Sequence, residues 1–215
     1  MSFWDENKGH GEIVQRELVS AEGGPTGKII TRNDWVTMAG VKLCGDERTL
    51  RFGGDGESRW IDFDVTVTAL ADEVTFGDTK EGSFGVRVAE SMKVDAKQGG
   101  RIINAEGKTD KAAWGQASPW VDYHGPVAGE TLGVAILNHP SSFRFPTYWH
   151  VREYGLFAAN VFGKKDFLGA TAIDGPHKMN KGESFTLRYR VLLHQGDEKQ
   201  GRVAEAFTKY AAEKK

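Results

Sequence analysis

Several large classes of protein are excluded by what this sequence lacks. Only one of its 215 residues is a cysteine, so no disulfide can form within the chain, and Cys44 is expected to be a small buried hydrophobic residue. No apolar run approaches the roughly eighteen residues that a membrane-spanning helix needs, and the N-terminus lacks the basic start and apolar core of a signal peptide. The chain is therefore expected to be soluble, without a membrane partner. The missing signal peptide favours the cytoplasm, although the compartment stays open.

The sequence also lacks a marked excess of charge of one sign. Its 28 lysine and arginine residues are offset by 30 aspartate and glutamate residues, which gives a net charge of -2 and a pI of about 6.3. The basic residues are dispersed among the acidic ones, so no basic stripe is available for a phosphate backbone. A nucleic-acid partner is not expected.

Motifs of metal, phosphate and serine chemistry are missing as well. The six histidines form no H-E-x-x-H motif, no glycine-rich loop leads into a helix, and no G-x-S-x-G is present. We therefore predict no metal and no cofactor. One alternative stays open, because Asp122 and His124 are two residues apart and share a face of an extended strand. Together with His139 or His150 they would form the two-histidine, one-carboxylate site of a non-haem iron protein, unless Asp122 simply caps a turn.

Glycine and alternating strand patterns are abundant instead. The 27 glycines are about twice the usual share of roughly 7%, which is typical of many tight turns. Apolar and polar residues alternate most clearly over 60–68 and 184–193, and further strands are predicted at 12–19, 28–36, 42–52 and 132–137. Residues 76–84, 114–126 and 164–179 are predicted to be irregular. From Glu198 onward, Val203, Phe207, Tyr210 and Ala211 recur at helical spacing.

These patterns predict an all-β fold. Many short strands, glycine-rich turns and one helix at the end favour an antiparallel β-sandwich with a C-terminal amphipathic helix. A length of 215 residues suits one domain, so we expect residues 1–215 to form a single β-sandwich domain.

The stretch 132–160 carries the strongest functional signal. Its apolar start reads as a strand buried on both faces, which delivers Asn138 and His139 to a loop. From Thr147 the residues favour a strand, and period-two alternation places four polar side chains on one face, namely Tyr148, His150, Arg152 and Tyr154. Such a row suits a polyhydroxylated ligand or an anion. The alternative is a solvated outer face, with Trp149 and Val151 turned inward.

Acid-base chemistry has one clear carboxyl candidate. Glu81 follows Lys80 in a charged loop, and its partner would be His124, His139 or His150, all in aromatic surroundings. The alternative for Glu81 is a surface ion pair with Lys80 or Arg87. Aromatic residues suited to the apolar face of a sugar are also plentiful, although core packing collects the same residue types; they are Trp114, Trp120, Tyr123, Tyr148, Trp149 and Tyr154.

Long motifs in the chain resemble a bacterial family of unassigned function that carries the label methane oxygenase PmoA-like. They are FWDE, FGDTKEGSFGVRVAESM, PWVDYHGP, ILNHPSSFR, PTYWHVREYGLFAAN and GESFTLRYRVLLH. The resemblance implies a sandwich of the galactose mutarotase-like supersandwich type, which sugar epimerases, lyases and carbohydrate-binding modules share. The oxygenase label conflicts with the sequence, since a membrane-bound oxygenase requires spanning helices.

Two departures from that family pattern matter. The family usually has a D-H-P-H-H-R-G-type motif before FWDE, so the chain is expected to be truncated at its N-terminus relative to the family. Relatives also commonly read F-R-H-P-T-Y-W-H where this sequence has Phe145. Both departures remove histidines from the expected site.

The sequence thus predicts a protein that binds a small carbohydrate or performs acid-base chemistry on one. The predicted catalytic residues are Glu81, His124, His139 and His150. The predicted ligand-binding residues are Lys80, Trp120, Asp122, Arg144, Tyr148, Trp149, Arg152 and Tyr154. The alternatives are a non-catalytic binding or structural domain and a non-haem oxygenase, and catalysis itself, the substrate and the oligomeric state stay open.

Overall fold

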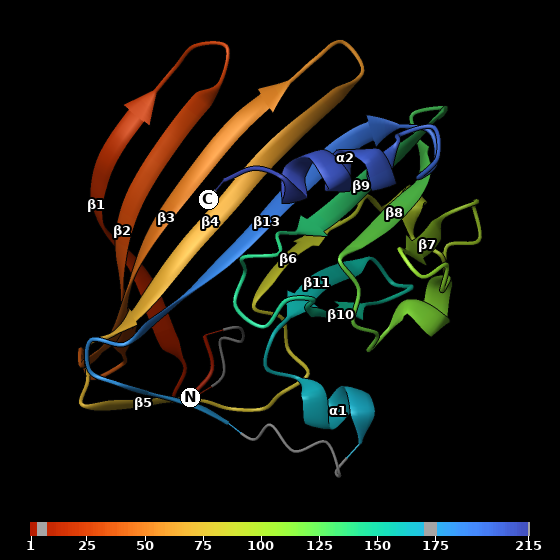
Figure 1. The fold of residues 1–215 in the computed structure, drawn as a ribbon. Helices are drawn as coiled ribbons and strands as arrows, with labels where there is room; N and C mark the ends of the chain where they lie inside the picture. The colour runs from red at the N-terminus through yellow and green to blue at the C-terminus, as the bar shows by residue number, and fades with distance from the viewer. Residues whose placement is uncertain (4–7, 170–175, 215) are drawn as a thin grey trace.

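The computed structural model describes residues 1–3, 8–169 and 176–214. Trp4, Asp5 and Glu6 of the FWDE motif lie outside the described residues. Within the described part of the chain, antiparallel strands form one large and two small sheets (Figure 1). The large sheet has the order β1-β2-β3-β4-β13-β9-β8-β7, and the small sheets have the orders β10-β11-β6 and β12-β5.

The large sheet consists of β1 (Gly11–Glu22), β2 (Gly27–Thr37), β3 (Lys42–Gly54), β4 (Ser58–Ala69), β7 (Arg101–Asn104), β8 (Trp120–Val127), β9 (Glu130–Asn138) and β13 (Ser184–Gln195). The small sheets consist of β5 (Glu73–Phe76), β6 (Phe84–Arg87), β10 (Tyr148–Val151), β11 (Leu156–Asn160) and β12 (His177–Asn180). The helices are α1 (Lys164–Leu168) and α2 (Val203–Ala211), with 3-10 turns η1 (Glu90–Met92) and η2 (Asp110–Ala113). The predicted all-β sandwich with a C-terminal helix is confirmed.

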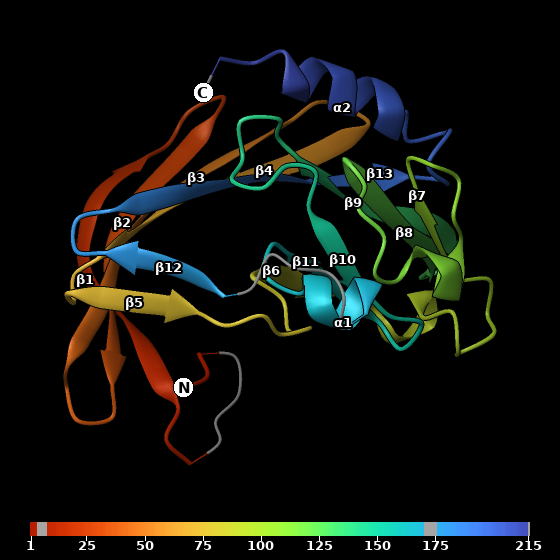
Figure 2. The ribbon, with the colours of Figure 1, turned by 60° about the horizontal axis from the view of Figure 1, so that its bottom comes forward.

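Apolar and polar side chains alternate along β4 and β13, and this alternation determines which face of the large sheet carries the core. Val65 pairs with Leu187 across the two strands, and both side chains are buried toward the small sheets. Asp62 pairs with Arg190 on the opposite face, where the guanidinium donates to the carboxylate at 2.6 Å. Burial of the apolar face stabilises the sheet by roughly 25 cal/mol per Å² of apolar surface removed from water. The main core therefore lies between the large sheet and the small ones (Figure 2).

The three-stranded sheet forms the second layer of the sandwich. Trp149 and Val151 of β10 and Phe157 of β11 point into the main core. Their neighbours along β10, Tyr148 and His150, therefore point away from it. Helix α1 lies on this outer side, where Phe167 stacks on Tyr148 with ring centroids 5.8 Å apart.

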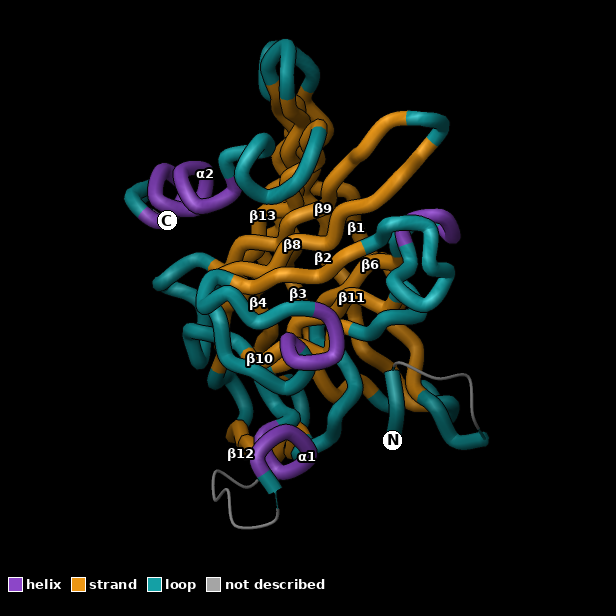
Figure 3. The backbone as a smooth tube through the Cα atoms, turned by 90° about the vertical axis from the view of Figure 1, so that its right-hand side faces the viewer, coloured by secondary structure: helices purple, strands orange, loops and turns teal. Residues whose placement is uncertain are grey.

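Helix α2 covers the opposite side of the molecule. Its apolar residues Val203 and Tyr210 pack on a second buried cluster that contains Trp120, Leu137 and Leu192 of β8, β9 and β13. Strand β9 thus has packed layers on both faces, which confirms the strand predicted from the apolar run 132–137. Figure 3 shows α1 and α2 on different sides of the strands. In the described residues, neither helix has the length and apolar character that a membrane crossing needs.

Two predictions about irregular segments are wrong in part. Residues 120–126 belong to β8, so Asp122 lies in mid-strand and caps no turn. Gly125 marks a close approach of two segments and not a turn: a Cβ there would lie 2.8 Å from the Cα of Met92. The segment 164–179 contains α1 and the start of β12, while residues 170–175 are outside the described residues.

Cys44 is buried in β3, as predicted. Burial, with the nearby charge of Asp46, raises the pKa of its thiol to about 11. The thiol is therefore protonated at neutral pH and behaves as a small apolar side chain.

Candidate functional site

The structure divides the predicted site residues into separate groups. Six come together at the outer side of the three-stranded sheet, namely Lys80, Glu81, Tyr148, His150, Arg152 and Tyr154. Trp120, Asp122 and His124 lie on the α2 side of the large sheet. Packed sheets are about 10 Å apart, so His124 and His150 face away from each other across the sandwich. They do not share one site.

Strand β10 presents only the first two residues of the predicted polar row. It ends at Val151, where a turn begins in which the Gly155 N–H donates to the Arg152 carbonyl at 3.0 Å. Arg152 and Tyr154 therefore lie outside β10, and period-two alternation does not put them on its polar face. That part of the prediction is wrong. The turn nevertheless brings these two side chains together and places Arg152 close to Trp114. The Arg152 guanidinium lies 5.6 Å from the centroid of the Tyr154 ring and 5.8 Å from that of the Trp114 ring.

His150 is buried and has a defined tautomer. The indole Nε1–H of Trp114 donates to its Nδ1 at 3.0 Å, and an indole N–H can only donate. In the neutral imidazole, the proton must therefore be on Nε2, for which the described residues supply no hydrogen-bond acceptor. Burial lowers the pKa of His150, and the charges of Arg152 and Lys80 lower it further, against the opposing effect of Glu81. His150 thus offers a neutral N–H donor at neutral pH.

The charges around His150 are mixed. Glu81 forms the ion pair with Lys80 that the sequence left open as an alternative, with 2.7 Å between Nζ and Oε1. Its carboxylate still acts on His150, because its charge raises the pKa of the imidazole. The side chain of Glu81 is 34% exposed, so it is accessible to a ligand. A carboxylate, a guanidinium and a neutral imidazole therefore lie within one polar neighbourhood.

Small residues flank His150 on the same face of the sheet. Strand pairing sets His150 beside Ala158 of β11, and Ala158 beside Gly85 of β6. Gly85 is exposed, and a Cβ there would lie 2.9 Å from the Cβ of Ala158. Trp114 and Phe167 also lie near the imidazole, with ring centroids 6.3 and 6.4 Å from it. Aromatic rings and a row of small residues are thus both close to His150.

Three predicted site residues have structural roles instead. Trp149 is fully buried and its Nε1–H donates to the Ser118 carbonyl at 2.9 Å. Arg144 donates to the Val161 carbonyl at 2.9 Å and lies over the rings of Phe143 and Phe162. His139 contacts Tyr210 of α2 with ring centroids 5.0 Å apart, and its ring nitrogens are bonded to Ser141 Oγ and to the Glu213 carbonyl. The prediction that these side chains hold a ligand or transfer protons is not supported by their geometry.

Asp122 forms the centre of a second cluster, under the segment that leads into α2. Its carboxylate oxygens lie 2.7 Å from Nδ1 of His124 and 2.7 Å from Nε2 of His194. The strand β9 between them carries Gly133, where a Cβ would lie 2.1 Å from the His194 ring. A glycine is therefore required for His194 to reach across β9 to Asp122.

His194 is the member of this cluster whose pKa is raised. Burial would lower the pKa of its imidazole, but the hydrogen bond and charge of Asp122 outweigh burial and raise the pKa. Its Nδ1 also faces the Gln195 carbonyl at 3.1 Å, so both ring nitrogens face acceptors. The predicted partners of Asp122 and His124, His139 and His150, are elsewhere, and His194 takes that place. If the alternating pattern of 184–193 is extended by one residue, it predicts His194 on the same face of the strand as Arg190 and Leu192.

Polar hollows are also present on the α2 side of the large sheet. One of about 560 Å³ is lined by Arg51, Asp64, Arg188 and Arg190, among others, and one of about 530 Å³ extends to His194 and Arg202. Apart from His194, the clusters described above take no part in lining them.

The lowered pKa of His150 predicts how the stability of the protein depends on pH. Because its pKa is lowered in the folded protein, the unfolded chain binds its proton more readily between the ordinary value of 6.5 and the folded value. The stability contribution of His150 is therefore complete above pH 6.5 and is lost as the pH falls below it. Histidine 15N NMR should show a titration midpoint below 6.5, with Nε2 protonated in the neutral form.

Trp114→Phe is the matched variant for that measurement, because it keeps an aromatic ring and removes the N–H. The midpoint of His150 should move upward in this variant, since Nδ1 becomes free to accept a proton. A wild-type midpoint at or above 6.5, or a neutral form protonated at Nδ1, would contradict the assigned tautomer.

Comparison with known proteins gives a match to a family and a partial match to a curated protein. A profile described as "Family of unknown function (DUF6807)" matches residues 1–208. The thiamine thiazole synthase of Methanococcus aeolicus is 35% identical over 100 residues, which covers 44% of this chain and 37% of that protein. The chain thus spans well under half of the length of this curated relative, and the match transfers no activity.

Proposed function

The chain belongs to DUF6807, a family of unknown function, and we propose that it binds a sugar acid at the outer side of the three-stranded sheet, around His150. One observation carries this proposal: Trp114 fixes the tautomer of His150, so that a neutral Nε2–H is presented beside the guanidinium of Arg152.

The chemistry of these groups matches an anionic, polyhydroxylated ligand. A neutral imidazole N–H donates to a hydroxyl or carbonyl oxygen without the cost of burying a charge. Arg152 offers a planar fork of donors that fits a carboxylate in bidentate geometry. The exposed ring of Tyr154 supplies an apolar surface for the ring face of a sugar. A neutral sugar would leave the charge of Arg152 unpaired, so an acid is favoured.

In acid-base chemistry on the bound sugar, Glu81 and His150 would have different roles. Glu81 is the group that accepts a proton, because its carboxylate is accessible and lies beside Lys80. His150 acts as a hydrogen-bond donor to the oxygen on which negative charge develops, since its neutral tautomer has no free lone pair toward the ligand. This revises the role predicted from sequence, in which His150 itself transferred a proton.

The family resemblance of the sequence motifs implies a galactose mutarotase-like sandwich, and such a fold would favour a sugar as the ligand class. This is an analogy of fold, and the same architecture hosts many functions. For this chain, the ligand class therefore follows from His150, Arg152 and Glu81 themselves.

Arg152→Gln tests the proposal directly. Loss of a charge-assisted hydrogen bond costs about 1.5–3 kcal/mol, so the variant should bind D-glucuronate or D-galacturonate about 10- to 150-fold more weakly in calorimetric titrations. Its stability should change by less than about 0.5 kcal/mol, because the guanidinium packs only on half-exposed rings. D-glucose and D-galactose, which lack the carboxylate, should bind equally to the wild type and the variant.

Arg101→Gln is the matched control, since Arg101 is an exposed arginine of β7. It should bind the sugar acids as the wild type does. The proposal fails if the wild type shows no saturable binding to any of these sugars, or if the two arginine variants lose the same affinity.

A further inference from the structure

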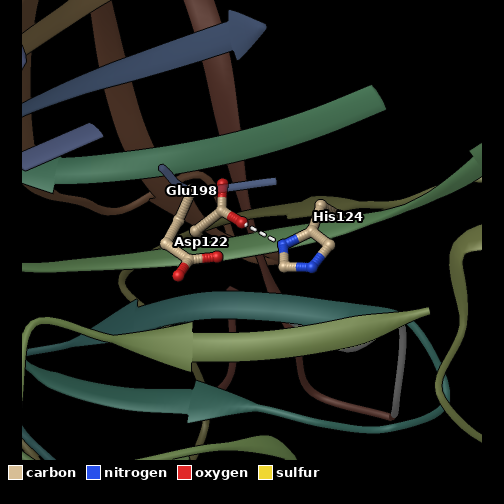
Figure 4. A group of neighbouring side chains, drawn as sticks. All are labelled: Asp122, His124 and Glu198. Atoms are coloured by element: carbon tan, nitrogen blue, oxygen red, sulfur yellow. Dashed lines mark hydrogen bonds and ion pairs between the residues drawn. The ribbon is translucent and has the colours of Figure 1, made fainter. Parts of the chain in front are cut away.

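Three side chains of the kinds that ligate metals lie close together on the opposite side of the sandwich from His150. Asp122 and His124 project from β8, and Glu198 comes from the segment between β13 and α2 (Figure 4). One ligand atom from each residue lies within 4.8 Å of the other two, and Asp122 and His124 are both buried. Residues far apart in the sequence thus bring an imidazole nitrogen and two carboxylates together.

We propose that Asp122, His124 and Glu198 bind a divalent first-row transition ion. The two carboxylates balance the charge of the ion, and the imidazole selects against Mg²⁺ and Ca²⁺, which prefer oxygen ligands alone. Three protein ligands leave coordination positions for water, as in zinc sites of the open type. Zinc is therefore the simplest occupant.

The residues around the three ligands fit such a site. His194 is hydrogen-bonded to the other oxygen of Asp122 at 2.7 Å, and this kind of outer partner orients a ligating carboxylate. The carboxylate of Glu198 has no hydrogen bond or ion pair with any other described residue, so it is available to an ion. Asp197, whose oxygen accepts from the N–H groups of Lys199 and Gln200, lies close enough to His124 to add negative charge.

Gly133 and Gly201 hold the outer partner in place. A Cβ at either position would lie 2.1 Å from an atom of the His194 ring, so the imidazole is enclosed between two glycines. This packing fixes one orientation of His194 and, through it, one orientation of the Asp122 carboxylate. A preorganised carboxylate is what a stoichiometric ion site requires.

Co²⁺ is the probe for the test, because its visible absorption reports coordination by nitrogen and oxygen ligands. Untagged, chelator-treated protein should bind about one equivalent of Co²⁺, and Zn²⁺ should displace it. Loss of an outer partner typically costs 10–100-fold in affinity, so Glu198→Gln, which removes a direct ligand, should weaken binding by about 100-fold or more. Glu198 is only partly buried, so the circular dichroism of the variant should match the wild type.

Glu130→Gln serves as the matched control, because Glu130 is an exposed glutamate at the start of β9. It should bind Co²⁺ as the wild type does. Absence of saturable binding by the wild type, or equal binding by Glu198→Gln and the wild type, overturns the proposal. In that case the Asp122 cluster is only a hydrogen-bonded anchor for the segment before α2.

Discussion

Asp122→Ala is expected to destabilise the metal-free protein by about 3–5 kcal/mol, because it removes one partner of a buried ion pair. The His194 side chain is 2% exposed and the Asp122 side chain 0%, so water cannot replace the lost carboxylate. Without Asp122, burial favours the neutral form of His194, and the energy lost is that of the buried pair and its hydrogen bonds. Urea denaturation in the presence of a chelator measures the difference.

The pH dependence of the same measurement identifies the cause. The pKa of His194 is raised in the folded protein, so the stability from the pair is complete below the ordinary value of 6.5 and is lost as the pH rises through the raised value. The difference between wild type and Asp122→Ala should therefore shrink at alkaline pH. Asp72→Ala, which removes an exposed carboxylate, should change stability by less than about 0.5 kcal/mol. A loss below about 1 kcal/mol for Asp122→Ala at pH 6 would contradict the ion pair.

Trp149→Ala is expected to cost about 3–5 kcal/mol of stability, as is typical when a buried aromatic residue is truncated. The indole is 0% exposed, packs on Phe157 and donates a hydrogen bond to the Ser118 carbonyl. Truncation would leave a cavity in the main core and an unpaired buried carbonyl. Denaturation monitored by circular dichroism measures this effect.

Tyr154→Ala provides the contrast for Trp149, because the Tyr154 ring is 40% exposed beside Arg152. It should weaken sugar-acid binding while leaving stability nearly unchanged. If Trp149→Ala instead keeps its stability and loses ligand affinity, then Trp149 holds the ligand and the core assignment is wrong.

Sequence patterns predicted the strands in which apolar and polar side chains alternate. Alternation over 60–68 and 184–193 correctly predicted that one face of each strand is buried. The helical spacing after Glu198 correctly predicted that α2 packs on the sheet. The pattern failed at β8 because that strand carries buried residues on both faces. Gly125 then looked like a turn, whereas it allows the approach of Met92.

The candidate site was predictable only where local geometry decides it. Period two correctly placed Tyr148 and His150 opposite Trp149, but the turn after Val151 brings Arg152 back by a path that no local pattern contains. The layer to which a histidine belongs is set by long-range pairing, so His124 and His150 could not be separated from sequence. Phe167 had no local signal at all, since α1 spans only five residues.

The central claim is that the neutral Nε2–H of His150 meets a ligand at the outer side of the three-stranded sheet. Histidine-selective 15N NMR, recorded while D-glucuronate or D-galacturonate is added, tests it most directly, because the imidazoles report separately from the two sides of the sandwich. We expect a saturable shift of the His150 Nε2 resonance, abolished in Arg152→Gln, and no shift of the His124 and His194 resonances. Shifts confined to His124 and His194, or no shift of any histidine, would contradict it.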